Sequence, residues 1–154
     1  MISDKEKYIN LSTQKKDSTL VNTPVWFAQD EDKNSFYVFS HGEAGKVKRI
    51  RNFSSVKVAT CNFKGDLHGE WLGAEAELVD QEEFIKLGYR LLRKKYPSMR
   101  IIDFFSKLSG NYKKRQLIEF KFKDTNQVRS FVITFPYICV NISSSSILTA
   151  SSIL

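Results

Sequence analysis

A basic segment that contains two glycines, H-G-E-A-G-K-V-K-R-I-R at residues 41–51, holds the residue types in this sequence best suited to bind an anion. It follows the apolar run at residues 36–39, a pattern typical of a strand, a tight turn and a helix start. The first turn of a helix favours acids, yet this one begins with Lys46, Lys48 and Arg49. A phosphate or carboxylate there would be bound by backbone N–H groups and a lysine together. The segment therefore indicates either a phosphate site or a solvated basic helix face.

Outside this segment, the sequence has no clear pattern for metal binding, redox chemistry or catalysis. The two cysteines, Cys61 and Cys139, lack C-x-x-C spacing and paired histidines, so no metal site and no redox pair is predicted. This cysteine usage favours a reducing cytoplasm as the location. His41 and His68 have no neighbouring nucleophile, so no catalytic residue is assigned.

The net charge of +7 raises the question of a nucleic-acid partner, because clustered Lys and Arg neutralise phosphates. Most of the 12 Phe and six Tyr residues alternate within apolar runs, which favours a core over stacking platforms. A small polyanion would be attracted by the same charge, and no nucleic acid is expected. No uninterrupted apolar run is long enough to span a bilayer and the N-terminus lacks a leader, so no membrane partner is expected either.

Alternating apolar residues predict strands at residues 8–13, 21–28, 35–40, 55–62, 70–79 and 115–123, with residues 128–135 as a candidate seventh. The second and third of these are expected to pair antiparallel. Pro24 cannot donate to a ladder, so its strand should lie at an edge, carry a bulge or face a ligand. Residues 70–79 would also suit a helix, but Gly73 and the strict alternation from Ala74 to Leu78 favour a strand.

Three helices should interrupt these strands. The first covers residues 44–52, the second opens with acids at residues 80–83 and stops before Pro97, and the third runs from Ser98 to Gly110. The expected fold is mainly β: a small antiparallel barrel of six or seven strands with helices packed on its ends. Residues 1–135 should form its single domain, and residues 136–154 are a serine-rich, uncharged tail of unknown role.

Several motifs together resemble one known family: Y-I-N-L-S-T, V-N-T-P-V-W-F-A, F-Y-V-F-S, E-A-G-K-V-K-R-I-R-N and V-K-V-A-T-C-N-F-K-G. They are similar to the split β-barrel family typified by pyridoxamine 5'-phosphate oxidase, and more narrowly to its small deazaflavin-dependent branch. The resemblance covers about residues 8–122. It implies an FMN-binding split barrel, a homodimer, and a cofactor groove at the subunit interface.

The resemblance also implies particular site residues. Lys46 would hold the cofactor phosphate, with Ser40 and Phe39 beside it, and Lys48 is a further candidate. The ring would lie along the T-P-V-W strand, and Trp71 of the G-E-W motif would approach from the other side. The residues carried over from that strand are Thr23, Val25 and Trp26. The chain departs from the family pattern at Ser18, where glycine is usual, and at residues 53–56, where N-P-R-V is usual.

The sequence therefore predicts a flavin- or deazaflavin-dependent oxidoreductase that transfers hydride to an unidentified organic substrate. FMN or a deazaflavin coenzyme would supply the chemistry, which is consistent with the lack of a visible catalytic constellation. The alternative is a non-catalytic protein of the same fold that binds flavin, heme or another polyanion, for storage or in stress protection.

Overall fold

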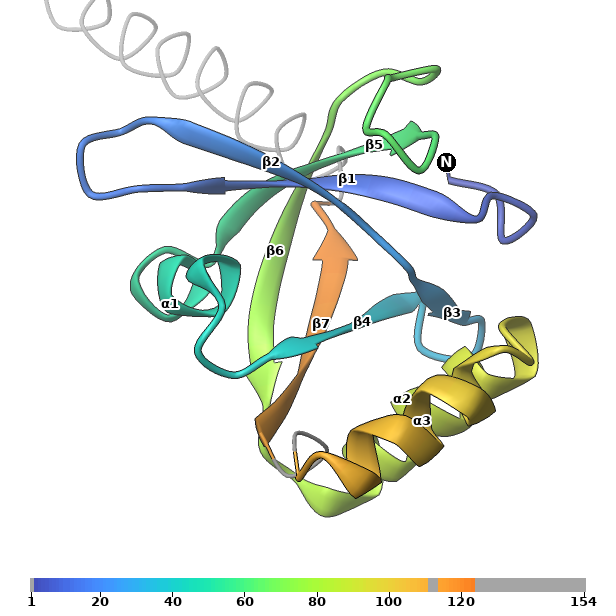
Figure 1. Ribbon diagram of the computed structural model, residues 1–154. Coiled ribbons are helices and arrows are strands. Elements are labelled where there is room, and N and C mark those ends of the chain that lie inside the picture. The colour runs from blue at the N-terminus through green and yellow to red at the C-terminus, as the bar shows by residue number, and fades with distance from the viewer. Residues whose placement is uncertain (1, 111–113, 124–154) are drawn as a thin grey trace, which may run out of the picture. The chain divides into compact units, whose positions relative to one another are not determined.

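Residues 2–110 and 114–123 are described by a computed structural model (Figure 1). The described residues up to Phe122 form one compact unit. The candidate strand at 128–135, the tail at 136–154 and the predicted domain boundary between them lie outside the described residues. Among the described helices, none is long and apolar enough to cross a bilayer.

Seven strands form one antiparallel sheet in the order β2-β1-β5-β6-β7-β4-β3. Three helices accompany it. The bounds of all elements are, in chain order, β1 (Tyr8–Gln14), β2 (Leu20–Val25), β3 (Ala28–Asp30), β4 (Ser35–His41), α1 (Gly45–Asn52), β5 (Ser55–Cys61), β6 (Leu72–Val79), α2 (Glu82–Lys95), α3 (Met99–Leu108) and β7 (Arg115–Phe122).

The sheet curls because its two edge strands are consecutive in the chain. Only Trp26 and Phe27 separate β2 from β3. Three residue steps span at most about 11 Å, whereas the edges of a flat seven-stranded sheet would lie about 29 Å apart. The described sheet is therefore a half-closed barrel, which confirms the predicted mainly β, antiparallel split-barrel class with flanking helices (Figure 1).

The prediction of a single strand at residues 21–28 is wrong in one respect. The segment is two strands: β2 pairs with β1, and only β3 pairs with β4. The break has a physical cause, since the chain crosses here from one sheet edge to the other, and Phe27 is fully buried at the crossing. The edge position expected from Pro24 is confirmed, because β2 is the first strand of the sheet and Pro24 lies opposite Asn10 of β1.

The remaining elements differ from the sequence predictions only at their ends. The strand character of β6 is confirmed, with Ala74 and Ala76 buried and Glu75 and Glu77 exposed, although it begins at Leu72 and not at Glu70. α2 has Glu82 and Glu83 in its first turn, after Gln81. Ser98 precedes α3, but its side chain makes no capping hydrogen bond.

Two apolar clusters lie on the two faces of the sheet. The inner one fills the curl and takes in Val47 and Ile50 of α1, for which the small Ala74 and Ala76 of β6 leave room. The outer one packs α2 against β4 and β7 through Tyr37, Leu92 and Leu117. α1 is thus anchored at the end of the barrel, which fixes where its first turn points.

Candidate functional site

The buried face of α1 determines the position of Lys46. Val47 and Ile50 are three residues apart and face the inner core. Lys46 is therefore held at the flank of the helix, half-buried, while Lys48 and Arg51 are exposed. Arg49, three residues after Lys46, lies on the same side of the helix, and its Nε donates to Thr13 Oγ1 of β1 at 2.8 Å.

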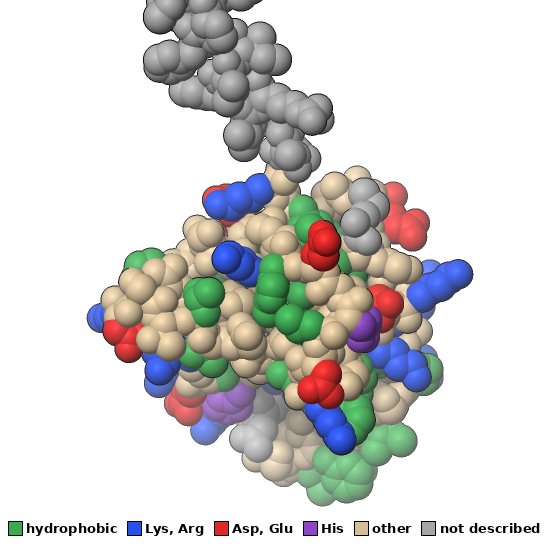
Figure 2. Space-filling view, turned by 90° about the horizontal axis from the view of Figure 1, so that it is seen from above, with side chains coloured by type: hydrophobic (Ala, Val, Ile, Leu, Met, Phe, Trp, Pro, Cys, Tyr) green, Lys and Arg blue, Asp and Glu red, His purple; other side chains and the backbone are tan. Residues whose placement is uncertain are grey.

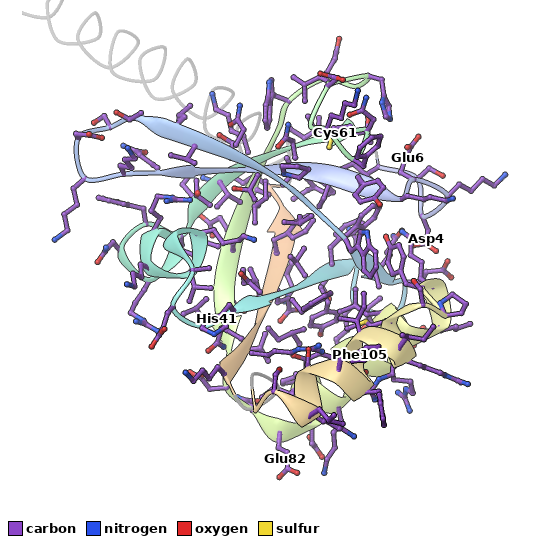
Figure 3. All side chains as sticks on the ribbon, viewed as in Figure 1. Asp4, Glu6, His41, Cys61, Glu82 and Phe105 are labelled. Atoms are coloured by element: carbon purple, nitrogen blue, oxygen red, sulfur yellow. The ribbon has the colours of Figure 1, made fainter. Side chains whose placement is uncertain are left out.

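The start of α1 has the free donors that an anion site requires. Its N-cap residue, Ala44, provides no side-chain cap, and the first turn holds no acid. The carbonyl of Ala44 accepts from the N–H groups of Val47 and Lys48, whereas the N–H groups of Gly45 and Lys46 have no acceptor among the described residues. His41, at the end of β4, accepts a hydrogen bond from the N–H of Glu43 at 3.3 Å and so belongs to the turn before the helix (Figure 3).

The electrostatics of Lys46 also favour an anion site at the start of α1. Its ammonium makes no ion pair with any described residue. Burial, and then the nearby Arg49 cation, hold the pKa of Lys46 below its ordinary value. A half-buried cation without an anionic partner is destabilised, and the attraction of a bound anion would offset this cost.

Lys46 lies at the edge of an open groove of about 330 Å³. The walls of this groove are apolar and aromatic except for the lysine, and they come from five elements and the crossing between β2 and β3. The lining residues are Tyr8, Pro24, Val25, Trp26, Phe39, Lys46 and Ile102. One cation in an aromatic groove suits a planar aromatic ligand with an anionic end.

Trp26 is held in this groove by two ring contacts. Its ring stacks on Tyr96 with centroids 4.7 Å apart and an interplanar angle of 5°, and it meets the edge of Phe39 at 6.4 Å. Tyr96 is itself fixed, because its hydroxyl contacts the carbonyls of Lys7 at 2.7 Å and Phe27 at 3.0 Å. Trp26 therefore has both roles that its sequence allowed, a packing role and a position in a candidate site.

A buried charge cluster lies next to Phe39 and Ile102. Asp103 of α3 accepts from Arg93 of α2 at 2.7 Å and from Arg115 of β7 at 2.5 Å. The Arg115 guanidinium also lies 5.2 Å from the centre of the Phe39 ring. Through these contacts, α2, β7 and α3 together place Phe39 and Ile102 at the groove.

Four of the eight predicted site residues line this groove: Val25, Trp26, Phe39 and Lys46. The other four do not. Ser40 is buried on the face of β4 opposite to Phe39, and Lys48 is exposed; Thr23 and Trp71 are half-buried outside the groove. Whether any of the eight binds a cofactor stays a prediction.

Sequence reasoning missed Tyr8 and Ile102 as lining residues. Tyr8 begins a strand and reads as core from its alternation. Ile102 lies more than 50 residues after Lys46 in a helix with an ordinary apolar stripe, so no local signal marks it. In the part of the chain that the structure describes, no group of three His, Cys, Asp or Glu side chains is arranged to hold a metal ion.

Comparison by sequence finds nothing: no family model and no curated protein matches this chain. Comparison of structures does find proteins with a similar fold. The heme storage protein HutZ from Vibrio cholerae superposes with a TM-score of 0.60 at 14% identity, over 77% of this chain and 83% of that one. An FAD-binding protein from Mesorhizobium loti superposes with a TM-score of 0.54 at 14% identity, over 79% of this chain and 82% of that one.

A third similar structure, from Listeria innocua, is assigned as a pyridoxamine 5'-phosphate oxidase and gives a TM-score of 0.51 at 15% identity, over 78% of this chain and 86% of that one. At such identities the likeness concerns the fold. The chain has the split-barrel fold shared by these proteins, and the narrower deazaflavin branch stays a prediction.

Proposed function

We propose that this protein is a flavin- or deazaflavin-dependent oxidoreductase that binds its cofactor in the groove at Lys46. The observation that carries the proposal is the half-buried Lys46 ammonium, which has no anionic partner among the described residues and lies beside the free N–H groups of the α1 first turn. The stacked Trp26 and the Phe39 ring give the same groove flat apolar walls. These residues fit a planar cofactor that ends in a phosphate.

In this proposal the residues of the chain bind and orient. Lys46 and the N–H groups of Gly45 and Lys46 hold the phosphate, while Trp26, Phe39 and Val25 bound the ring and exclude water from one side. When bound, the cofactor supplies hydride transfer to an organic substrate. The groove is open on one side in a single chain, which suits a homodimer, and the cysteine usage favours a cytoplasmic location.

The first experiment is a titration with FMN and with a deazaflavin coenzyme, followed by absorbance and gel filtration. The wild-type protein should retain one of them, and Lys46→Ala should weaken binding by about tenfold or more, because a charge-assisted contact to phosphate is lost. The matched control is Arg51→Ala, which removes an exposed cation from the same helix and should bind as the wild type does. Equal binding by both variants and wild type would remove Lys46 from the proposal.

A non-catalytic binding protein is the second candidate, favoured by the TM-score of 0.60 to a heme storage protein. Here the groove would hold a flavin, heme or another polyanion without turnover. The two candidates differ in one measurement: a bound cofactor is reduced chemically and its reoxidation by added organic acceptors is followed by absorbance. Reoxidation with turnover supports the oxidoreductase, and tight binding with no electron transfer supports the second candidate.

A further inference from the structure

The apolar stripe of α3 faces away from the protein. Its members lie at i, i+3, i+4 and i+7, the spacing that normally marks the core side of a helix. Here they are exposed: Ile101 by 62%, Phe104 by 60%, Phe105 by 63% and Leu108 by 74%. Figure 3 labels Phe105 on α3, and Figure 2 shows a group of hydrophobic side chains at the lower edge of its view. We call these four residues the α3 stripe.

The orientation of α3 has a structural cause. The side of the helix that faces the protein carries Met99 and Asp103, and Asp103 is held by Arg93 and Arg115. Turning the α3 stripe inward would bring Asp103 out and break both ion pairs. The stripe is therefore fixed outward by a buried charge cluster on its opposite side, and an exposed apolar patch of this kind marks an interaction surface.

The charges around the stripe select its partner. The only acid of α3 is the buried Asp103, whereas Arg100 is exposed on the same helix, and Arg90 and Lys94 are exposed on the neighbouring α2. A second copy of this chain would carry the same cations beside its own stripe, so charge complementarity does not favour it as the partner. An anionic surface would be attracted instead, and aromatic and aliphatic side chains flanked by cations are what interfacial helices present to lipid.

We propose that the α3 stripe docks on the surface of an anionic phospholipid bilayer. The Phe104, Phe105 and Leu108 side chains enter the boundary between headgroups and acyl chains, and Arg100 with its neighbours contacts the phosphates. The sequence prediction of no membrane partner rested on the lack of a spanning segment, and surface docking requires none. The proposal does not depend on the ligand of the groove, although Ile102 borders both the groove and the stripe, so docking would bring the groove near the lipid.

The test is cosedimentation of the full chain with vesicles of phosphatidylcholine alone and of equal parts phosphatidylcholine and phosphatidylglycerol. Wild-type protein should bind the mixed vesicles at low salt and bind phosphatidylcholine weakly. The double variant Phe104→Ser, Phe105→Ser should lower the partition coefficient by about tenfold or more. Arg100→Ala should lower it by about fivefold, and high salt should weaken binding as well.

The chain offers matched controls for both changes. Phe63 is 66% exposed in the loop between β5 and β6, so Phe63→Ser removes a similar ring elsewhere and should bind as wild type does. Lys16→Ala in the turn between β1 and β2 removes an exposed cation away from α3. Urea unfolding of each variant checks that the fold is intact. Absence of binding to the mixed vesicles, or equal binding by the Phe104, Phe105 and Phe63 variants, overturns the proposal. So does a double variant that changes a dimer into a monomer, because a second copy would then cover the stripe.

Discussion

At the scale of single residues, Lys46 lowers the stability of the unliganded fold, and its charge would favour the binding of an anionic ligand. Its ammonium is partly removed from water and lies near Arg49, so the charged form is disfavoured in the unliganded fold. Because its pKa is lowered on folding, this penalty is fully present below the folded-state pKa. The penalty is relieved as pH rises from there toward the ordinary value. The fold therefore tolerates a cost at this position that an apolar residue would avoid.

Lys46→Met should accordingly raise the free energy of unfolding of the unliganded protein at pH 7 by about 0.5 to 1 kcal/mol, because methionine fills the groove edge without a buried charge. The same variant should lose affinity for a phosphate-bearing ligand. Urea unfolding with and without FMN measures both effects, and Arg51→Met is the control at an exposed site. A clear destabilisation by Lys46→Met would contradict the account of this lysine.

Tyr96 is the second residue with a distinct role, because its hydroxyl joins two separate parts of the backbone. Its hydroxyl contacts the carbonyls of Lys7 and Phe27, and it accepts from the Phe27 N–H at 3.4 Å, so it ties the start of β1 to the crossing between β2 and β3. Burial raises the pKa of Tyr96 well above its ordinary value. For an acid whose pKa rises on folding, stability is present below the ordinary value and is lost as pH rises above it.

Tyr96→Phe should lower the free energy of unfolding by about 1 to 2 kcal/mol at pH 8, because buried backbone groups lose a partner. The difference from wild type should shrink above pH 10, where the wild-type hydroxyl begins to oppose folding. Urea unfolding at the two pH values measures this. If the difference in free energy of unfolding between wild type and Tyr96→Phe grows with pH, the expected direction of the pH dependence is wrong.

At the scale of elements, the contact of α2 with the sheet depends on Gly88. A methyl group at this position would lie 2.5 Å from Leu117 Cδ2 and 3.1 Å from the Tyr37 ring. Leu117 and Tyr37 are both buried in the outer core, so they have little room to move. The close approach of helix and sheet therefore requires glycine, although glycine weakens a helix.

Gly88→Ala should lower the free energy of unfolding by about 1 to 2 kcal/mol, because overpacking outweighs the better helix propensity of alanine. Gly73→Ala in β6 is the matched control, since a methyl group there would have no atom within 4 Å and should leave stability unchanged or slightly higher. Denaturation midpoints compare the two. Stabilisation by Gly88→Ala would mean that α2 can move away from the sheet.

At the scale of the whole molecule, the groove is bounded by the curl of the sheet on one side and is open on the other. This geometry, with the resemblance to a dimeric family, is the basis for the proposed homodimer. The protein should then elute on gel filtration with light scattering at twice its 17.8 kDa mass, and dilution to monomer should weaken cofactor binding. A monomer that binds cofactor with full affinity at every concentration would contradict a shared site.

The sequence by itself determined the types and approximate bounds of the elements and the helix start just before Lys46, and it limited the Pro24 strand to an edge, a bulge or a ligand-facing position. It could do so because side-chain periodicity, proline and helix-end chemistry act over a few neighbouring residues. Only the tertiary structure decided that the run at residues 21–28 breaks at Trp26 and Phe27. It also decided that Tyr8 and Ile102 line the same groove as Lys46, that Ser40 lies on the opposite face of β4 from Phe39, and that the α3 stripe faces outward. These features depend on strand register, the closure of the sheet and ion pairs such as Asp103 with Arg115, which join residues far apart in the chain and leave no local pattern.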